Sequence, residues 1–167
     1  IYDILNLARF APSGGNRQGN RVIIIRDLET RRKISEISVS PAKIYTAQVK
    51  QGESPWNTIH PSAVTGDQVE KTEPLSLLTE SYVKASVLLV FALDLSVVAS
   101  MDKDLSRVGV VSGASIYPFV WNTLLAARQA GLGGTITTLP IANEPALKEI
   151  LKIPSEYAVS ALVPLGK

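Results

Sequence analysis

The chain has 167 residues, 46% of them hydrophobic and 19% charged, and its formal net charge is +2. These values predict one globular domain over residues 1–167 and exclude a disordered chain, a fibrous chain and a strongly basic nucleic-acid-binding protein. There is no cysteine and one histidine, His60, so disulfides, thiolate nucleophiles and clustered histidine metal sites are excluded as well.

The first part of the chain alternates between helical and strand patterns. Residues 2–10 have a helical period, and Pro12 ends that helix because the residue before a proline avoids the α region. The loop "APSGGNRQGNR" at 11–21 follows. Residues 21–27 are a continuous run of strand formers, typical of a strand buried on both faces. Residues 28–38 return to a helical period.

Residues 40–74 are rich in Pro, Gly, Ser, Thr and Gln, and we expect an irregular excursion or lid there. Loops of this length are usually functional or disordered. Within the excursion, Tyr45 and Trp56 could stack on an aromatic substrate or pack against a partner subunit. His60 is expected to be a solvated loop residue.

The middle of the chain contains the most apolar elements. Residues 76–84 predict a short helix and residues 85–94 a second buried strand, followed by a polar loop at 95–111. Residues 114–131 predict the longest helix, which carries no charge before Arg128. An apolar helix must be covered on every side, so it lies at the centre of the core or in a subunit interface.

Residues 135–139 predict a strand, 143–151 a helix with an early proline, and 157–166 a final strand. This order of elements indicates an α/β layered sandwich with a mixed sheet. The longest apolar run, 87–93, is far shorter than the ~20 residues of a membrane helix. Because no signal peptide is visible, the cytoplasm is the expected location. Both ends of the chain are expected to be trimmed.

The familiar catalytic motifs are missing. "GVVSG" at 109–113 has the letters of a nucleophile elbow at the wrong spacing, and no histidine follows it, which argues against a serine hydrolase. The glycine-rich loop fits neither the Rossmann nor the P-loop pattern. Asp102 and Asp104 lack further metal ligands and are expected to be solvated. An enzyme without a general base takes its chemistry from a cofactor, and a flavin is one that suffices.

Three stretches offer neutral hydrogen-bonding groups. In the first, Ser13 and Asn16 carry short polar side chains, and Gly14 lets a planar ligand approach the backbone. The second, "SGAS" at 112–115, places hydroxyls at the start of the apolar helix, where anions are favoured. The third, "GLGGTITTL" at 131–139, leads from a glycine-rich turn into exposed N–H groups. Each alone also reads as a plain turn, helix cap or strand entry; together they describe a pocket.

The segment "ILNLARFAPSGGNRQGNRVIIIRDLETRRKI" resembles the opening of the nitroreductase family, whose members carry Ala-Pro-Ser-x-x-Asn-x-Gln-Pro-Trp before a buried strand. "WNTLLAARQAGLGG" and "ALKEILKIPSEYAVSALVPLG" resemble the second half of that family. The resemblance covers most of the chain and is weakest across 40–80.

The resemblance implies an α+β fold, a three-layer α/β/α sandwich with a mixed, mainly antiparallel sheet, that forms a homodimer with FMN at the interface. It implies NAD(P)H as reductant, a nitroaromatic or quinone-type acceptor, and a ping-pong cycle. No catalytic side chain is expected, because the flavin carries the chemistry. The implied cofactor-binding residues are Pro12, Ser13, Gly14, Asn16, Gln18, Ser115, Thr137, Thr138 and Leu139.

Two departures from the family pattern leave alternatives open. Gly19-Asn20 stands where the family has Pro-Trp, and the family's terminal phosphate-binding motifs lie outside the printed chain. Arg17 or Arg21 could assist with phosphate or lie at the surface. A flavin-binding protein without turnover, and a flavin enzyme with a dehalogenation or oxygen-dependent reaction, remain alternatives. On the apolar helix, Leu124 is expected at the dimer contact.

Overall fold

The computed structural model describes residues 1–167 and contains seven α-helices, three short 3₁₀ helices and four strands. The α-helices are α1 (Tyr2–Ala8), α2 (Leu28–Ile37), α3 (Val39–Lys50), α4 (Gly66–Glu70), α5 (Leu77–Lys84), α6 (Tyr117–Gln129) and α7 (Glu144–Leu151). The 3₁₀ helices are η1 (Gly14–Asn16), η2 (Val111–Ser115) and η3 (Leu139–Asn143). The strands are β1 (Asn20–Ile25), β2 (Val87–Asp94), β3 (Gly133–Gly134) and β4 (Tyr157–Gly166).

The four strands form one sheet in the order β1-β2-β4-β3, and every pairing is antiparallel. Strand β2 is central and buried from Val87 to Leu93, which explains why its sequence is a continuous apolar run. Opposite the step from Phe91 to Ala92, strand β4 carries one extra residue, Ser160. Such a bulge bends a strand, and bulges are common beside functional sites.

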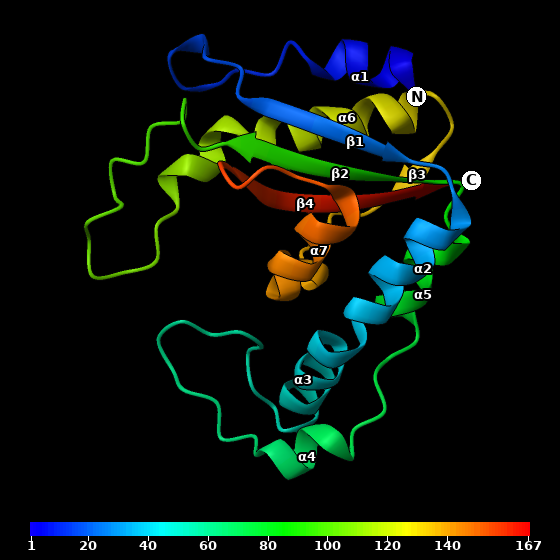
Figure 1. Cartoon of the computed structure of the whole chain (residues 1–167), viewed down its shortest axis with the longest axis vertical. Helices are drawn as coiled ribbons and strands as arrows, with labels where there is room; N and C mark the ends of the chain where they lie inside the picture. The colour runs from blue at the N-terminus through cyan, green and yellow to red at the C-terminus, as the bar shows by residue number, and fades with distance from the viewer.

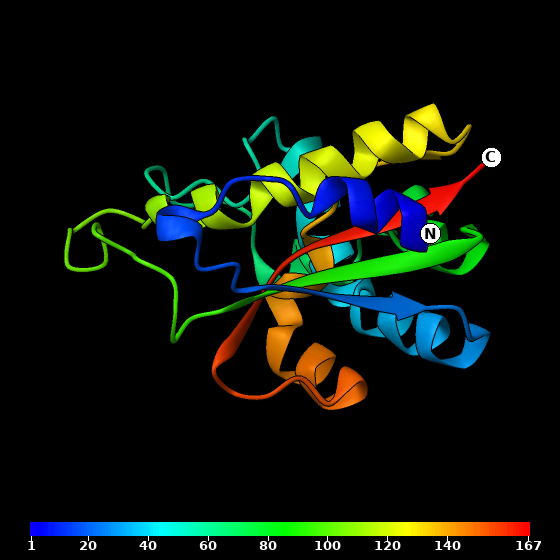
Figure 2. The same ribbon diagram turned by 90° about the horizontal axis from the view of Figure 1, so that it is seen from above.

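Helices cover both faces of the sheet (Figures 1 and 2). Helices α1 and α6 lie side by side on one face, where the larger core cluster includes the edge-to-face pair Phe91–Phe119, with ring centroids 5.6 Å apart. Helices α2, α5 and α7 cover the other face around a second cluster that contains Ile34, Tyr82 and Leu147. This confirms the α+β three-layer sandwich with a mainly antiparallel sheet. No helix is both long and apolar enough for a membrane span.

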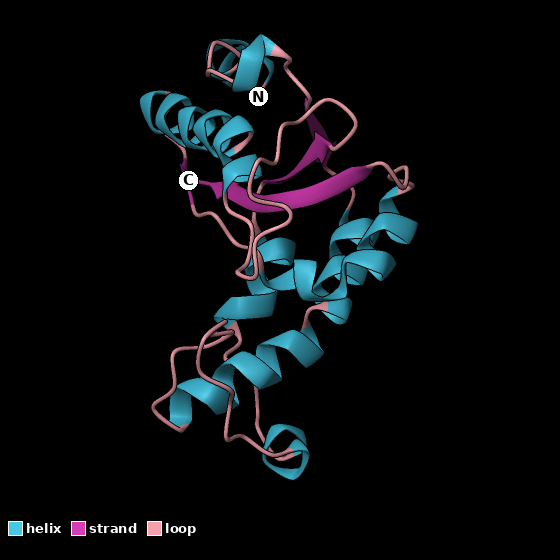
Figure 3. Cartoon of the chain, turned by 90° about the vertical axis from the view of Figure 1, so that its left-hand side faces the viewer, coloured by secondary structure: helices cyan, strands magenta, loops and turns pink.

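The prediction of an irregular excursion over residues 40–74 is wrong for two parts of that range. Residues 39–50 form α3 and residues 66–70 form α4, and both lie farther from the sheet than the other helices (Figure 3). Pro41 is tolerated because it lies in the first turn of α3, where no intrahelical N–H is required. Residues 51–65 are irregular, as predicted.

The predicted strand at 135–139 and the mixed sheet also need correction. Strand β3 ends at Gly134, Thr137 forms only an isolated bridge with Leu162, and Leu139 begins a 3₁₀ helix. Pro140 has no N–H for a ladder and suits the first turn of a helix, so the strand cannot continue. No parallel pair occurs in the sheet.

Candidate functional site

The loop after α1 is a tight turn held by its own side chains. Gly15, Asn16 and Gln18 all have φ between 51° and 59°, a region that glycine adopts freely and asparagine tolerates. The Ser13 Oγ accepts a hydrogen bond from the Gln18 N–H at 3.0 Å. The Gln18 side-chain Nε2 donates to Asn16 Oδ1 at 3.0 Å. The polar residues of the first predicted stretch therefore fix one another before any ligand arrives.

Ser115 joins this loop to the start of α6. Its Oγ accepts a hydrogen bond from the Gly14 N–H at 3.1 Å, across 101 residues of sequence. A Cβ added to Gly14 would lie 3.2 Å from that same oxygen, so the site favours glycine. The structure thus brings the first and second predicted stretches together, with Ser115 buried behind the loop.

Both arginines of the loop bond to main-chain carbonyls. Arg17 Nη1 donates to the Val97 oxygen at 3.3 Å. Arg21 Nη1 donates to the Asn20 oxygen at 2.8 Å and to the Gln18 oxygen at 3.3 Å. Arg17 thus ties the loop to the segment after β2, whereas Arg21 bonds within the loop itself.

Gly19 is buried against the turn that follows β2. A Cβ at this position would approach the Val97 Cγ2 to 2.8 Å and the Asp94 main-chain oxygen to 3.3 Å. The close approach of this turn accounts for glycine where the family pattern has proline.

The third stretch is anchored on β4. The main-chain N–H and oxygen of Thr137 both pair with Leu162, at 2.9 and 2.8 Å. Its hydroxyl lies 3.2 Å from the hydroxyl of Tyr82, a buried side chain whose pKa is raised by burial. All the polar groups of Thr137 are therefore engaged, whereas Thr138 is exposed and its N–H bonds to no other group of the chain.

Thr137, Thr138 and Leu139 line a cavity of about 790 Å³. Tyr45 of α3 and Trp56 of the following loop line the same cavity, so the structure places both aromatic candidates opposite the third predicted stretch. Pockets that bind small molecules commonly enclose 300–1,000 Å³, roughly, and carry aromatic walls.

The loop at 13–18 does not line this cavity. Ser13, Gly14, Gln18 and Ser115 border a separate crevice of about 10 Å³, and Pro12 and Asn16 are exposed beside it. One copy of the chain therefore divides the predicted cofactor-binding residues between two places.

Tyr117 is a site residue that sequence reasoning missed. Its side chain lines the 790 Å³ cavity and a neighbouring cavity of about 630 Å³, and its hydroxyl donates to the main-chain oxygen of Ser160 at 3.0 Å. A Cβ on Gly113 would come within 3.1 Å of the Tyr117 ring. The sign of this site residue in the sequence was Gly113, the glycine four residues before the aromatic side chain.

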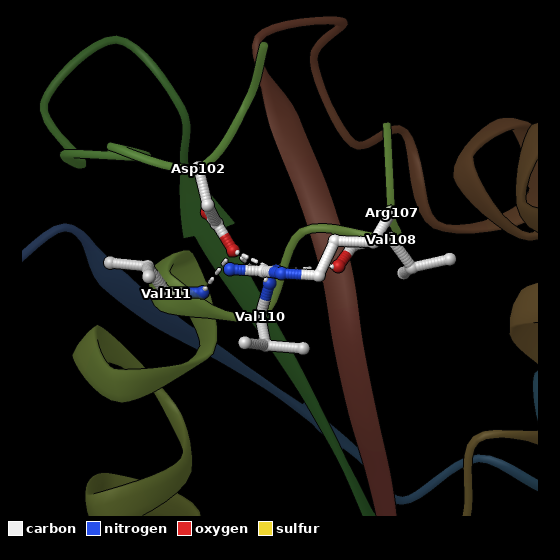
Figure 4. Close-up of polar contacts among 5 residues, drawn as sticks. All are labelled: Asp102, Arg107, Val108, Val110 and Val111. Atoms are coloured by element: carbon white, nitrogen blue, oxygen red, sulfur yellow. Dashed lines mark hydrogen bonds and ion pairs between the residues drawn. The ribbon is translucent and has the colours of Figure 1, made fainter. Parts of the chain in front are cut away.

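Asp102 is buried rather than solvated, whereas Asp104 is exposed as predicted. Asp102 Oδ2 accepts hydrogen bonds from the Val110 N–H at 2.7 Å, from Arg107 Nη1 at 2.8 Å and from the Val111 N–H at 3.3 Å (Figure 4). These bonds, that from Val110 above all, lower the pKa of Asp102 from 3.8 to about 2. The carboxylate ties the 95–111 loop to the turn that carries Ser115.

Asp102→Asn is expected to loosen the 95–111 loop, because an amide cannot replace a charged acceptor of three hydrogen bonds at one oxygen. Limited proteolysis should cut the variant in this loop faster than the native protein. Asp104→Asn is the matched control, since Asp104 is exposed and pairs only with Lys103 in the same loop. Equal cleavage of both variants would contradict this role.

The lowered pKa of the Asp102 carboxylate predicts that the stability of the fold depends on pH. Since folding lowers its pKa to about 2, Asp102 stabilises the fold fully above its ordinary pKa of 3.8, and this contribution disappears as the pH falls toward 2. Thermal unfolding of the native protein and of Asp102→Asn should therefore differ most near neutral pH and converge in acid. A difference that stays constant down to acid pH would exclude this assignment.

The comparisons with known proteins give the family and the fold of the chain. A model described as the nitroreductase family matches residues 1–167. The fold is similar to that of an iodotyrosine deiodinase bound to FMN and 3-iodo-L-tyrosine, with a TM-score of 0.65, 21% identity, and 98% of this chain and 74% of that chain covered. No curated protein matches the sequence.

Two structures from Vibrio are also similar. For the NADPH:FMN oxidoreductase of Vibrio harveyi complexed with NAD+, the TM-score is 0.62 and the identity 19%, with 99% of this chain and 57% of that chain covered. For nitroreductase A of Vibrio parahaemolyticus the corresponding values are 0.63, 20%, 99% and 56%. This chain therefore spans little more than half the length of these two proteins. With the family model matching from end to end, the chain belongs to the nitroreductase family.

Proposed function

We propose that this chain binds FMN and transfers hydride from NAD(P)H to an aromatic acceptor of the nitroaromatic or quinone type, in two successive half-reactions at one face of the cofactor. The observation that carries the proposal is the presence of two sites lined mainly by uncharged groups. One is the self-braced loop at 13–18 bonded to Ser115, and the other is the aromatic-walled cavity beside Thr137–Leu139. Neither site presents an acid–base pair, which is what cofactor-borne chemistry requires.

The loop residues fit a flavin. Gly14 has no side chain, and the Asn16 Nδ2 donates to no group of the chain while its Oδ1 is occupied by Gln18. The Ser13 Oγ is used as an acceptor, which leaves its hydroxyl hydrogen free to donate. A flavin ring presents carbonyl and ring-nitrogen acceptors to such donors, and when bound it supplies two-electron hydride chemistry.

A second copy of the chain would bring the two sites together. Along α6, Tyr117, Trp121 and Leu125 recur at intervals of four residues and are 42%, 56% and 54% exposed. Phe10, after the neighbouring helix α1, is exposed as well. A continuous exposed apolar face of this kind marks an interaction surface, and we infer that two copies pack there as a homodimer.

Leu124 needs a different assignment from the expected one. It is half-buried, packs against the larger core cluster, and would lie 3.2 Å from a Cβ on Gly134. A charge at Leu124 would therefore disturb the fold of one chain rather than test the contact between two.

The hydrogen bonds that fix Thr137 determine the electrostatics of the site at the aromatic cavity. Because Tyr82 and Leu162 hold Thr137, the next residue, Thr138, presents a free N–H in a fixed direction. A preorganised N–H stabilises negative charge without having to rearrange. Tyr45 and Trp56 would orient the acceptor ring by stacking, with the bulged Ser160 and Tyr117 closing the far wall.

The test is anaerobic reduction of the FMN-reconstituted protein with NADH and with NADPH, followed by addition of nitrofurazone or menadione. The proposal predicts that the yellow absorbance bleaches with the nicotinamide and returns with the acceptor. Bound flavin that neither nicotinamide reduces would favour a flavin-binding protein without turnover. If the yellow absorbance returned with an iodinated phenol but not with nitrofurazone or menadione, dehalogenation would be favoured. The aromatic cavity would suit that substrate equally well.

Asn16→Ala is expected to weaken FMN binding while the fold is kept. Loss of one polar contact to a bound ligand costs about 1–3 kcal/mol, or roughly a 5- to 150-fold rise in Kd. Asn16→Asp sharpens the test, because it keeps an acceptor for Gln18 and the tolerance of positive φ but removes the free donor. Fluorescence titration of FMN measures both; unchanged affinity in both variants would refute the contact.

A further inference from the structure

A polar hollow of about 350 Å³ lies next to the aromatic cavity, and Trp56 lines both. The hollow is bordered by the end of α3 and by the loop that follows it, residues 48–62. Its other lining side chains are polar or proline, and His60, exposed as predicted, is among them. A ligand in the aromatic cavity therefore has a hydrophilic recess beside the indole ring.

Gln48 is the feature of this hollow that points to a ligand. Its side chain belongs to α3 and is 7% exposed. Its Oε1 accepts a hydrogen bond from the Trp56 N–H at 3.2 Å, whereas its Nε2 donates to no group of the chain. The Nε2 is not among the fully buried polar atoms, so it can be reached from the hollow that Gln48 lines, and an acceptor placed there would receive its hydrogen bond.

The neighbouring side chains restrict the chemistry of the occupant. Asn57 Oδ1 accepts hydrogen bonds from the Ile59 and His60 N–H groups, both at 2.8 Å, so its amide is oriented and its Nδ2 is free to donate. The Glu53 carboxylate accepts from Ser62 Oγ at 2.6 Å and from the Ala63 N–H at 2.7 Å. Its negative charge disfavours a carboxylate or phosphate in the hollow, so the free N–H donors select an uncharged oxygen acceptor.

Trp56 is held in an unusual backbone conformation. Its φ is 57°, which is rare for a bulky side chain. The hydrogen bond from its N–H to Gln48 helps to hold it there. This hydrogen bond helps to keep the indole at the boundary between the aromatic cavity and the polar hollow.

We propose that the hollow is a second subsite, which binds an uncharged carbonyl-bearing group, such as a carboxamide, attached to an aromatic ring that occupies the cavity beside Thr137–Leu139. Gln48 and Asn57 are its donors, and Trp56 contacts the ring on the other side. Reduction of the ring in the cavity rests on the proposed function. Selection of the attached group by the hollow does not depend on it.

The test compares 4-nitrobenzamide, 4-nitrobenzoate and 4-nitrotoluene by calorimetric titration of the FMN-loaded protein, and by KM where turnover occurs. The native protein should bind the amide about 5- to 10-fold more tightly than the other two, as expected for one or two added hydrogen bonds. Gln48→Glu keeps the acceptor for Trp56 and removes the free donor. It should abolish the preference for the amide over 4-nitrotoluene.

Gln51→Glu is the matched control, since it adds the same charge to an exposed residue at the end of α3. Equal affinity of the native protein for the amide and the toluene derivative overturns the subsite, as does an intact preference in Gln48→Glu. If the preference is present but NAD(P)H does not reduce the flavin, the subsite stands and the proposed function fails. The native comparison decides the question even if Gln48→Glu does not fold.

Discussion

Leu125→Glu is expected to convert the protein from a dimer to a monomer and to abolish tight FMN binding. Leu125 lies on the exposed ridge of α6 together with Trp121 and Tyr117, so a carboxylate there would be stranded in an apolar contact without a partner. Because one chain divides the proposed cofactor-binding residues between two places, loss of the dimer should also remove half of the FMN site.

Size-exclusion chromatography with light scattering measures the first effect, and FMN titration the second. Ser155→Glu is the control, since it adds the same charge at an exposed turn before β4. Circular dichroism of Leu125→Glu should match that of the native protein. A Leu125→Glu variant that remains a dimer with unchanged flavin affinity would show that α6 faces elsewhere.

Gly134→Ala is expected to give the largest loss of stability from a single methyl group. A Cβ at this position would lie 2.5 Å from Leu165 Cδ2 and 2.9 Å from the Pro164 main-chain oxygen, so β3 would have to leave β4. Overpacking of this kind typically costs about 1–3 kcal/mol. Residues 137–139 begin three positions after Gly134, so FMN affinity should fall with stability.

Gly133→Ala is the matched control, because the nearest atom to its added Cβ is 4.0 Å away. Thermal unfolding by circular dichroism should place the melting temperature of Gly134→Ala several degrees below that of Gly133→Ala. The same melting temperature for both variants would mean that the β3–β4 contact yields easily and that the third stretch is not rigidly placed.

Local patterns in the sequence were sufficient for the elements that pack in the core. The runs at 21–27 and 85–94 were identified as strands because unbroken apolar runs have few other uses in a chain of this size. The predicted burial on both faces is confirmed for β2 but is wrong for β1, an edge strand in which only Ile25 is buried. The apolar helix and the helix before the last strand were found from helical periodicity and, for the second, an early proline. Each of these signals lies within the element itself.

The elements that were missed depend on contacts from outside their own segment. Helix α3 contains proline, threonine and glutamine, which resemble a loop in the sequence, yet Ala42, Thr46 and Gln48 are buried by packing against other elements. The residues on either side of Asp102 in the sequence do not distinguish it from a solvated aspartate. Its hydrogen-bond donors become available only where the chain returns at Val110. Nothing local to residues 95–111 carries that information.

The candidate site shows the same division. All three stretches were expected to form one pocket, and the bond between Gly14 and Ser115 brings only the first two into contact. The third stretch lies elsewhere on the chain, because Thr137 is tied to β4 and faces Tyr45 and Trp56 instead. Periodicity assigns residues to helices and strands but does not say where around the sheet they lie. The separation of the third stretch from the first two therefore needed the structure.

The central claim is that FMN is held where two copies of the chain meet. Analytical ultracentrifugation of the FMN-reconstituted protein, recorded at both protein and flavin wavelengths, tests it directly. The account predicts that the flavin sediments with a species of twice the chain mass, at one FMN per chain. Flavin that sediments with a single chain, or free of the protein at micromolar concentration, would contradict it.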